Sequence, residues 1–188
     1  MAFLVLKRSD RDFHKDLAEG YDRGAVLEDL MKRFGADVWN FAYFLTRSSD
    51  TADDLAQEVF LAAYRSLYNF RGGDESLKSW LLKITRNKTL HHLQSAFMRR
   101  VKLPGRLPFI DAAPAAEQIY FEKHARNLLW EAVLDLPLKY REVLILDYHY
   151  GLSNQEIAQL SGIAEGTVKS RIHRAKKKLA AHLGRDER

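Results

Sequence analysis

The chain has 188 residues, of which 46% are hydrophobic and 29% charged, and it carries a net charge of +5. This length accommodates one or two small domains. No stretch approaches the roughly 20 apolar residues of a membrane span, and we expect no secretory signal because the apolar run near the start is too short. The absence of cysteine excludes a disulfide framework, a thiolate metal site and a thiol nucleophile, and it is consistent with a reducing cytosol.

Apolar residues of the first half recur at helical spacing, and no β-alternation of useful length interrupts them. We expect four helices there, over residues 11–20, 25–44, 49–68 and 76–93. The second of these helices carries a candidate core stripe formed by Val26, Leu30, Phe34, Val38, Phe41 and Leu45. The predicted fold is therefore all-α.

A proline-rich segment divides the chain, because three of its four prolines fall within residues 104–114 and helical periodicity ends there. We interpret residues 97–121 as a flexible linker. It joins two small helical domains, one of residues 1–96 and one of residues 122–188.

The second domain is predicted to begin with a helix over about 120–136, which Pro137 ends. A further helix over 138–148 leads into the segment GLSNQEIAQLSGIAEGTVKSRIHRA. This segment has the pattern of a helix-turn-helix, with a short first helix that breaks at Ser161-Gly162.

The two helices of this motif have identifiable ends and faces. Ser153 or Asn154 can cap the first helix. The second helix has a buried stripe at i, i+4, i+7, i+11 spacing, made by Val168, Ile172, Ala175 and Leu179. Its opposite face presents hydroxyl, imidazole and cationic groups from Ser170, His173, Arg174 and Lys177. Such a helix suits the DNA major groove, although a helical hairpin with a solvated basic face has the same pattern.

The positive charge is concentrated on this second helix. Residues 164–183 contain six lysines and arginines against one glutamate, a local charge of +5, and the whole chain is also +5. The rest of the chain therefore sums to zero. A local basic surface is typical of contact with phosphates, with a solvated tail as the alternative.

The third helix of the first domain carries an acidic, hydrogen-bonding face instead. Its members share i, i+3, i+4, i+7, i+8 spacing and are Asp50, Asp53, Asp54, Gln57 and Glu58. Helix capping and the helix dipole explain Asp50 and Asp53 but not Gln57 and Glu58, which lie further along the helix. Because an acidic stripe repels DNA, we interpret it as a docking face for a basic protein partner.

The fourth helix has a polar, partly basic face with Lys83 and Asn87. Asn87 can pair bidentately with adenine, or it can simply be solvated. Trp80 can stack on an exposed base, or it can belong to the core. The residues alone leave these alternatives open.

The order of these motifs resembles that of bacterial sigma factors of the extracytoplasmic-function (ECF) class in the sigma-70 family. The resemblance rests on DxxDDLAQEVF, the FRG loop, SWLLKITRN, the proline-rich linker, LPLKYREVLIL and GLSNQEIA…GIAEGTVKSRIHRAKKKL. It covers about residues 22–95 and 122–183. It implies sigma domains 2 and 4, a transcription initiation factor that is not an enzyme, and neither cofactor nor metal.

The resemblance also implies a role for each set of residues. Those that would bind core RNA polymerase, on the clamp of its largest subunit, are Asp50, Asp53, Asp54, Gln57, Glu58 and Phe60. Those that would contact the −10 promoter element are Phe70, Arg71, Lys78, Trp80, Lys83, Arg86 and Asn87. Those that would contact the −35 element are Thr167, Lys169, Ser170, His173, Arg174 and Lys177.

The implied partners are core polymerase, promoter DNA and an anti-sigma factor, with no small-molecule substrate. We expect a cytoplasmic protein, associated with the nucleoid in the holoenzyme or held at the membrane by an anti-sigma factor.

Two other functions are compatible with parts of this sequence. A stand-alone helix-turn-helix regulator would bind duplex DNA as a homodimer, but it leaves the acidic helix and the FRG loop without a role. A metal-dependent hydrolase using the acidic residues with His91 or His92 fits poorly, because those carboxylates lie along one helix instead of converging in a pocket.

Overall fold

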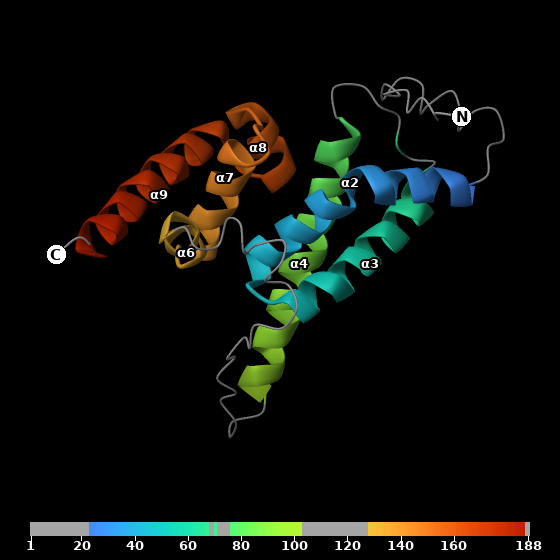
Figure 1. Cartoon of the computed structure of the whole chain (residues 1–188), viewed down its shortest axis with the longest axis horizontal. Helices are drawn as coiled ribbons and strands as arrows, with labels where there is room; N and C mark the ends of the chain where they lie inside the picture. Colours follow the sequence, from blue (N-terminus) through green and yellow to red (C-terminus); the bar gives the residue numbers. More distant parts are fainter. Residues whose placement is uncertain (1–22, 68–69, 71–75, 103–127, 187–188) are drawn as a thin grey trace, which may run out of the picture.

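The computed structural model describes residues 23–67, 70, 76–102 and 128–186. All regular structure in these residues is helical, as predicted (Figure 1). The helices are α2 (Arg23–Thr46), α3 (Ser49–Ser66), α4 (Leu77–Lys102), α6 (Leu128–Leu134), α7 (Leu138–Tyr148), α8 (Asn154–Ser161) and α9 (Glu165–Asp186). The helix expected over 11–20 and most of the expected linker lie outside the described residues.

The helices α2, α3 and α4 pack against one another as a first bundle. The predicted stripe of α2 is its core face, with Leu30, Val38 and Phe41 fully buried. A tight turn joins α2 to α3, where Arg47 has a positive φ of 61° and Ser48 caps α3 by accepting a hydrogen bond from the Thr51 amide at 3.3 Å. Since the turn is short, the two helices run antiparallel and bury their apolar faces against each other.

Helix α4 is longer than the sequence pattern predicted. It continues to Lys102 instead of ending near Leu93, and its last turns extend away from the bundle (Figure 1). No proline or glycine interrupts residues 77–102. The helix ends two residues before Pro104, whose ring is incompatible with a continuing helix. The first residues of the expected linker are therefore helical.

The second bundle is built around α7, which is buried on all sides from Tyr140 to Leu146. Helix α8 begins with a capping box in which Ser153 and Glu156 satisfy each other's backbone amides. It ends at Gly162, which adopts the left-handed conformation with φ 67°. The turn into α9 therefore follows the helix-turn-helix pattern predicted from the sequence.

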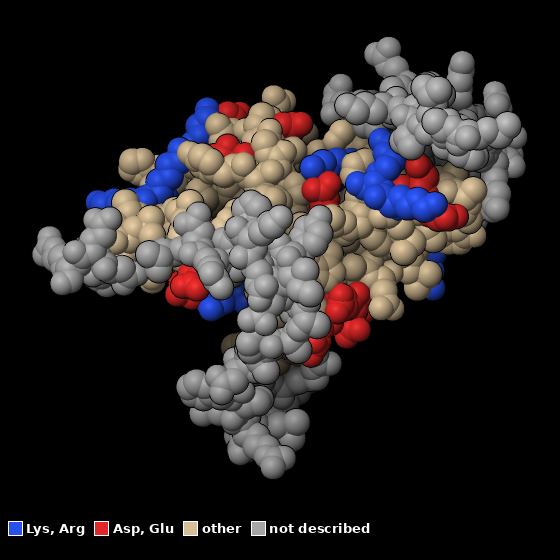
Figure 2. All heavy atoms as spheres, viewed as in Figure 1, with Lys and Arg blue, Asp and Glu red and all other residues tan. Residues whose placement is uncertain are grey.

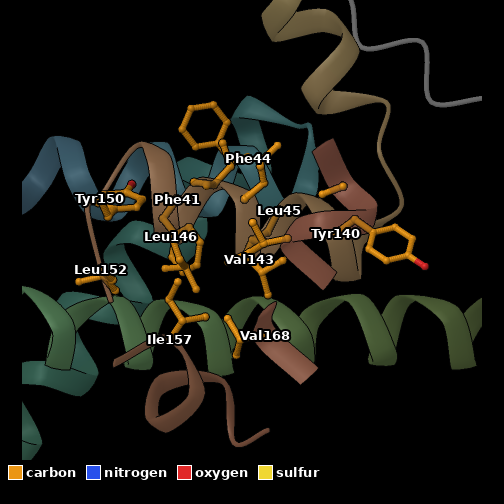
Figure 3. Packing of buried hydrophobic residues seen from close by; sticks show 14 of the residues in the cluster. Phe41, Phe44, Leu45, Tyr140, Val143, Leu146, Tyr150, Leu152, Ile157 and Val168 are labelled. Carbon is orange, nitrogen blue, oxygen red and sulfur yellow. The ribbon is translucent and has the colours of Figure 1, made fainter. Parts of the chain in front are cut away.

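The two bundles share one hydrophobic core. Phe41, Phe44 and Leu45 of α2 and Leu82 of α4 belong to the same buried cluster as the central residues of α7, α8 and α9. Figure 3 shows Phe41 and Leu45 lying beside Val143 and Leu146. The sequence predicted two domains but not this packing between them.

Candidate nucleic-acid and protein interfaces

The acidic face predicted on α3 is exposed. Asp50, Asp53, Asp54, Gln57 and Glu58 all lie at the surface, and Figure 2 shows acidic side chains gathered near the start of α3. Two of these carboxylates also have partners inside the molecule. Asp53 accepts a hydrogen bond of 2.7 Å from the indole of Trp39, and Glu58 pairs with Lys88 of α4 at 3.2 Å.

Phe60, at the end of the same predicted set, is placed differently. Its side chain is 5% exposed and packs in the core of the first bundle. It lies a turn and a half beyond Asp54 on the inner side of α3, with Val59 and Ala63. In this structure Phe60 therefore supports the helix and is not part of its exposed face.

The aromatic residues predicted at the −10 site pack together. Phe70 is 6% exposed, and its ring centroid lies 5.0 Å from that of Trp80 in a tilted arrangement. Trp80 is half-buried against the core of the first bundle. Arg71, between Phe70 and α4, lies outside the described residues.

The polar residues predicted on α4 point in two directions. Asn87 is exposed and Lys83 half-buried. Lys78 pairs with Asp37 at 3.1 Å, and its ammonium lies 5.2 Å from the ring centroid of Tyr150. Arg86 donates a hydrogen bond from Nε to Glu142 of α7. The structure thus separates Lys78 and Arg86, which face the second bundle, from the exposed Asn87.

The outer face of α9 is exposed and basic, as predicted. Val168, Ile172 and Ala175 are buried beneath it, and Figure 2 shows basic side chains along the helix. The exposed members are Lys169, Ser170, His173, Arg174 and Lys177, and Thr167 is half-buried. Lys169 pairs with Glu165 one turn earlier at 2.8 Å. The Ser170 hydroxyl donates to the Thr167 carbonyl at 3.0 Å.

Two family models match the chain in the same order as these faces. Residues 30–96 match sigma-70 region 2, and residues 126–179 match sigma-70 region 4. ECF RNA polymerase sigma factor SigM of Mycobacterium tuberculosis (strain H37Rv) is 33% identical over 178 residues, covering 95% of this chain and 86% of SigM. The chain belongs to the ECF sigma factors. This family consists of transcription initiation factors that direct RNA polymerase to promoters, and it is not a family of enzymes.

Other relatives agree with this assignment. ECF RNA polymerase sigma factor SigE of Mycolicibacterium smegmatis is 33% identical over 162 residues, and the chain spans 62% of that protein's length. The sigma factor RpoE from Bartonella quintana, solved in complex with the anti-sigma factor NepR, matches with a TM-score of 0.69 and 27% identity over 84% of this chain and 95% of RpoE. CnrH, solved in complex with the cytosolic domain of CnrY, matches with a TM-score of 0.65 and 25% identity over 94% of this chain and 98% of CnrH.

The polar residues that join the two halves of this sigma factor were not predicted from the sequence. Arg141 of α7 is 6% exposed. Its guanidinium donates to the carbonyls of Leu134, of Leu136 at 3.2 Å, and of Leu45 in α2 at 3.0 Å. Burial lowers the pKa of Arg141 to about 10, so it remains charged near neutral pH. The signal was a charged pair, Arg141-Glu142, within the otherwise apolar stretch of residues 140–146.

Two aromatic residues after α7 complete this junction. The Tyr150 hydroxyl donates to the Asp37 carbonyl at 2.7 Å, and burial raises its pKa. His149 lies beside the rings of Phe44, Trp130 and Tyr150, with centroids 5.3, 6.1 and 4.7 Å away. Desolvation among these rings lowers the pKa of His149.

Neither a metal-binding group nor a membrane-spanning helix is present among the described residues. Across 23–67, 76–102 and 128–186, no three His, Asp or Glu side chains come together in a group that could hold a metal. No helix among the described residues is long and apolar enough to cross a membrane. The acidic residues of α3 therefore do not form a metal-binding group with the histidines of α4.

Proposed function

We propose that this sigma factor binds core RNA polymerase through the acidic face of α3 and places α4 and α9 on the two promoter elements. The observation that carries the proposal is the separation of charge between two exposed faces. In the first bundle, α3 exposes carboxylates. In the second bundle, α9 exposes lysine and arginine side chains. Carboxylates favour a basic protein surface, whereas the basic helix favours DNA.

On the −35 side, α9 is supported by α8 in the manner of a helix-turn-helix. The exposed side chains of its first three turns are the ones that reach base edges when such a helix enters the major groove. Arg174 is suited to guanine, and Lys169 and Lys177 to phosphates. His173 lies on the same face and adds a further polar contact.

On the −10 side, α4 offers the cation of Lys83 and the amide of Asn87, about one and two turns after Trp80, which packs on Phe70. Strand opening requires that a base leave its stack, at a cost of a few kcal/mol, which contacts to the unstacked base offset. Aromatic rings and amides can provide those contacts. We infer that the FRG loop and α4 receive the unstacked strand.

We assign a role to each part of the chain according to the sigma-70 region that it matches. We propose that residues 1–96 act in polymerase docking and −10 recognition, that residues 97–121 link the halves, and that residues 122–188 recognise the −35 element. An anti-sigma factor is the proposed regulator, since RpoE was solved with one. We also propose a cytoplasmic location, where the polymerase and promoter are.

Run-off transcription by reconstituted core polymerase tests the proposal. Promoter sequences are first selected from a random library by the holoenzyme, and transcription from a selected promoter is then measured with and without this chain. We expect transcripts only when the chain is present, and a −10 and a −35 motif shared among the selected sequences. If the chain neither binds core polymerase nor changes which templates are transcribed, the proposed function is wrong.

A DNA-binding measurement without polymerase distinguishes the sigma factor from a stand-alone regulator. Such a regulator binds a palindromic duplex as a homodimer without polymerase. Binding of the chain to selected duplexes is therefore measured in the absence of core polymerase, with its mass determined by light scattering. Tight binding of a dimer to an inverted repeat would favour the regulator over the sigma factor.

A further inference from the structure

A tryptophan of α2 holds one of the carboxylates on the exposed face of α3. The indole Nε1–H of Trp39 donates a hydrogen bond of 2.7 Å to Oδ1 of Asp53. The two residues are fourteen positions apart in the sequence, and they meet because the short turn at Arg47 and Ser48 folds α3 back along α2. Asp53 is exposed, so its carboxylate faces solvent while the indole fixes one of its oxygens.

The indole ring of Trp39 is itself held in place. It stacks on the ring of Tyr43, one turn later on α2, with centroids 5.4 Å apart and planes 5° from parallel. Both rings pack against a small buried cluster of Ala42, Ala52 and Leu55, which joins α2 to α3. Because the ring has a stacking partner and lies on this cluster, its N–H keeps its direction. Trp39 therefore presents a fixed hydrogen-bond donor at the edge of the acidic face.

This contact differs in kind from the ion pair on the same face. Lys88 of α4 pairs with Glu58 at 3.2 Å, with side chains 40% and 57% exposed. A lysine brings a positive charge, which a basic partner must displace or share the carboxylate with. An indole is a neutral donor and does not offset the charge of the carboxylate. An ionised carboxylate accepts about four hydrogen bonds through its two oxygens, so Asp53 keeps its charge and most of its accepting capacity.

A carboxylate that is oriented before its partner arrives favours association. An aspartate side chain without a fixed contact samples several rotamers, and the entropy lost in fixing one of them opposes binding. The hydrogen bond from Trp39 fixes Asp53 in the free chain, so less of this entropy remains to be lost on docking. A lysine or arginine of the partner can then bind through Oδ2.

We propose that Trp39 is a positioning residue for polymerase docking, which orients the carboxylate of Asp53 toward a basic group of the polymerase without neutralising it. The inference rests on the proposed function for the identity of the partner, whereas the hydrogen bond itself belongs to the free chain. Trp39 acts through Asp53. Removing the indole N–H should therefore weaken docking only while the Asp53 carboxylate is present.

A double-mutant cycle tests the proposal, with the affinity of the full chain for core polymerase measured by fluorescence anisotropy. Trp39→Phe keeps an aromatic ring beside Tyr43 but removes the N–H, and we expect a loss of affinity of about three- to tenfold. Asp53→Ala should lose at least as much. In the Asp53→Ala background, Trp39→Phe should have no further effect. Lys88→Met is the matched control, because it removes the other contact to an α3 carboxylate, and it should leave the affinity unchanged or raise it.

A tryptophan analogue keeps the test decisive if Trp39→Phe lowers the thermal unfolding temperature. Benzothienylalanine incorporated at position 39 replaces the N–H with sulfur in a ring of nearly the same shape, and it should reproduce the loss of affinity. An equal loss for Lys88→Met, a full effect of Trp39→Phe in the Asp53→Ala background, or normal affinity with the analogue would each overturn the positioning role.

Nuclear magnetic resonance of the nitrogen-15-labelled free chain checks the hydrogen bond without polymerase. The sequence has three tryptophans, and the indole N–H signal that is missing in Trp39→Phe belongs to Trp39. Its proton resonance should move upfield in Asp53→Ala, because a hydrogen bond is lost, and an unchanged resonance would overturn the inference at its first step. If the resonance moves as expected but the parent chain does not bind core polymerase, the proposed function is wrong, and with it the partner assigned to Asp53.

Discussion

Arg141 is the residue that most directly ties α7 to its surroundings. Its guanidinium donates to three backbone carbonyls: one at the end of α6, one in the turn that follows it and one at the end of α2. Carbonyls at helix ends have no partner within their own helix, so a buried arginine that reaches them satisfies groups that water cannot. The residue thus fixes the ends of two helices and the position of a third.

Replacing Arg141 with methionine should destabilise the fold by about 2–4 kcal/mol, because hydrogen bonds from a charged donor are lost and carbonyls remain buried without partners. Urea denaturation monitored by circular dichroism measures the change. Lys139→Met is the control on the same helix. Lys139 is exposed and contacts only the Tyr140 ring among the interactions described, so its loss should cost less than about 1 kcal/mol. Equal effects of the two substitutions would contradict this role for Arg141.

His149 makes stability depend on pH. Desolvation lowers its pKa in the fold, with Lys78 acting in the same direction and Asp37 against it. The unfolded chain therefore binds more protons than the folded chain, and stability falls as the pH drops below about 6.5. The carboxyl groups with lowered pKa, Glu28 and Glu156, start from 4.5 and do not titrate in this range.

The urea midpoint should therefore decrease as the pH is lowered from 7.5 to 5.5. The slope of the unfolding free energy against pH should correspond to a difference of less than one bound proton between the unfolded and folded chains. His149→Phe keeps an aromatic ring beside Phe44 and Trp130 but removes the titrating group. This variant should lose most of the slope. A slope that is unchanged in the variant would assign the pH dependence to another group.

Arg174 is expected to carry part of the −35 specificity. It is exposed on α9, and a bidentate contact to a base is worth about 1–3 kcal/mol. Arg174→Ala should weaken recognition by that amount and relax selectivity at one position of the −35 element, as measured by competition between promoter variants. Lys178→Ala is the control, since Lys178 is also exposed on α9 but its ammonium lies 5.9 Å from the Tyr140 ring centroid. A uniform loss over all promoters would indicate a phosphate contact instead.

At the scale of elements, the inner face of α3 packs in the core and its outer face is exposed to solvent. Its inner face is core, with Leu55, Val59 and Ala63 buried. On its outer face, Asp53 and Glu58 have partners in α2 and α4. Asp54 is exposed and lies between them along the helix. An exposed carboxylate of this kind contributes to association more than to stability.

Asp54→Ala should therefore weaken binding to core polymerase severalfold, by about 1 kcal/mol, and leave the fold intact. Fluorescence anisotropy of the labelled chain measures the affinity, and thermal unfolding checks the fold. Glu28→Ala removes a carboxylate of similar exposure from α2 and should leave the affinity unchanged. If both variants bind equally weakly, the effect is one of net charge and not of the α3 face.

Which elements could be predicted from the sequence depends on how local their signals are. The stripe of α2, the serine cap and Gly162 of α8, and the two faces of α9 are short-range patterns, and each agrees with the structure. The end of α4 was placed too early because the apolar periodicity weakens after Leu93, where Phe97 is 65% exposed. The partner of Arg86 lies 56 residues away, and no spacing within α4 could indicate it. Contacts of that range depend on the assembled fold.

At the scale of the whole molecule, the two bundles should unfold together because they share a core. Two neighbouring leucines on α4 distinguish packing inside the first bundle from packing between the two bundles. Leu81 and Leu82 are both buried, at 1% and 0% exposed, but Leu81 belongs to the cluster of the first bundle and Leu82 to the shared cluster. The same chemical change at adjacent positions therefore removes packing from different places.

Leu82→Ala should reduce stability by about 2–5 kcal/mol and lower hydrogen-exchange protection in α7 as well as in α4. Leu81→Ala should cost a similar amount but lower protection mainly in α2, α3 and α4. Hydrogen exchange followed by mass spectrometry of peptides from each helix distinguishes these patterns. The difference arises because a cavity beside α7 weakens the contact that makes the two bundles one cooperative unit, whereas a cavity inside the first bundle leaves that contact in place. If Leu82→Ala left α7 as protected as in the parent chain, Leu82 would not couple the two bundles, and this prediction would be wrong.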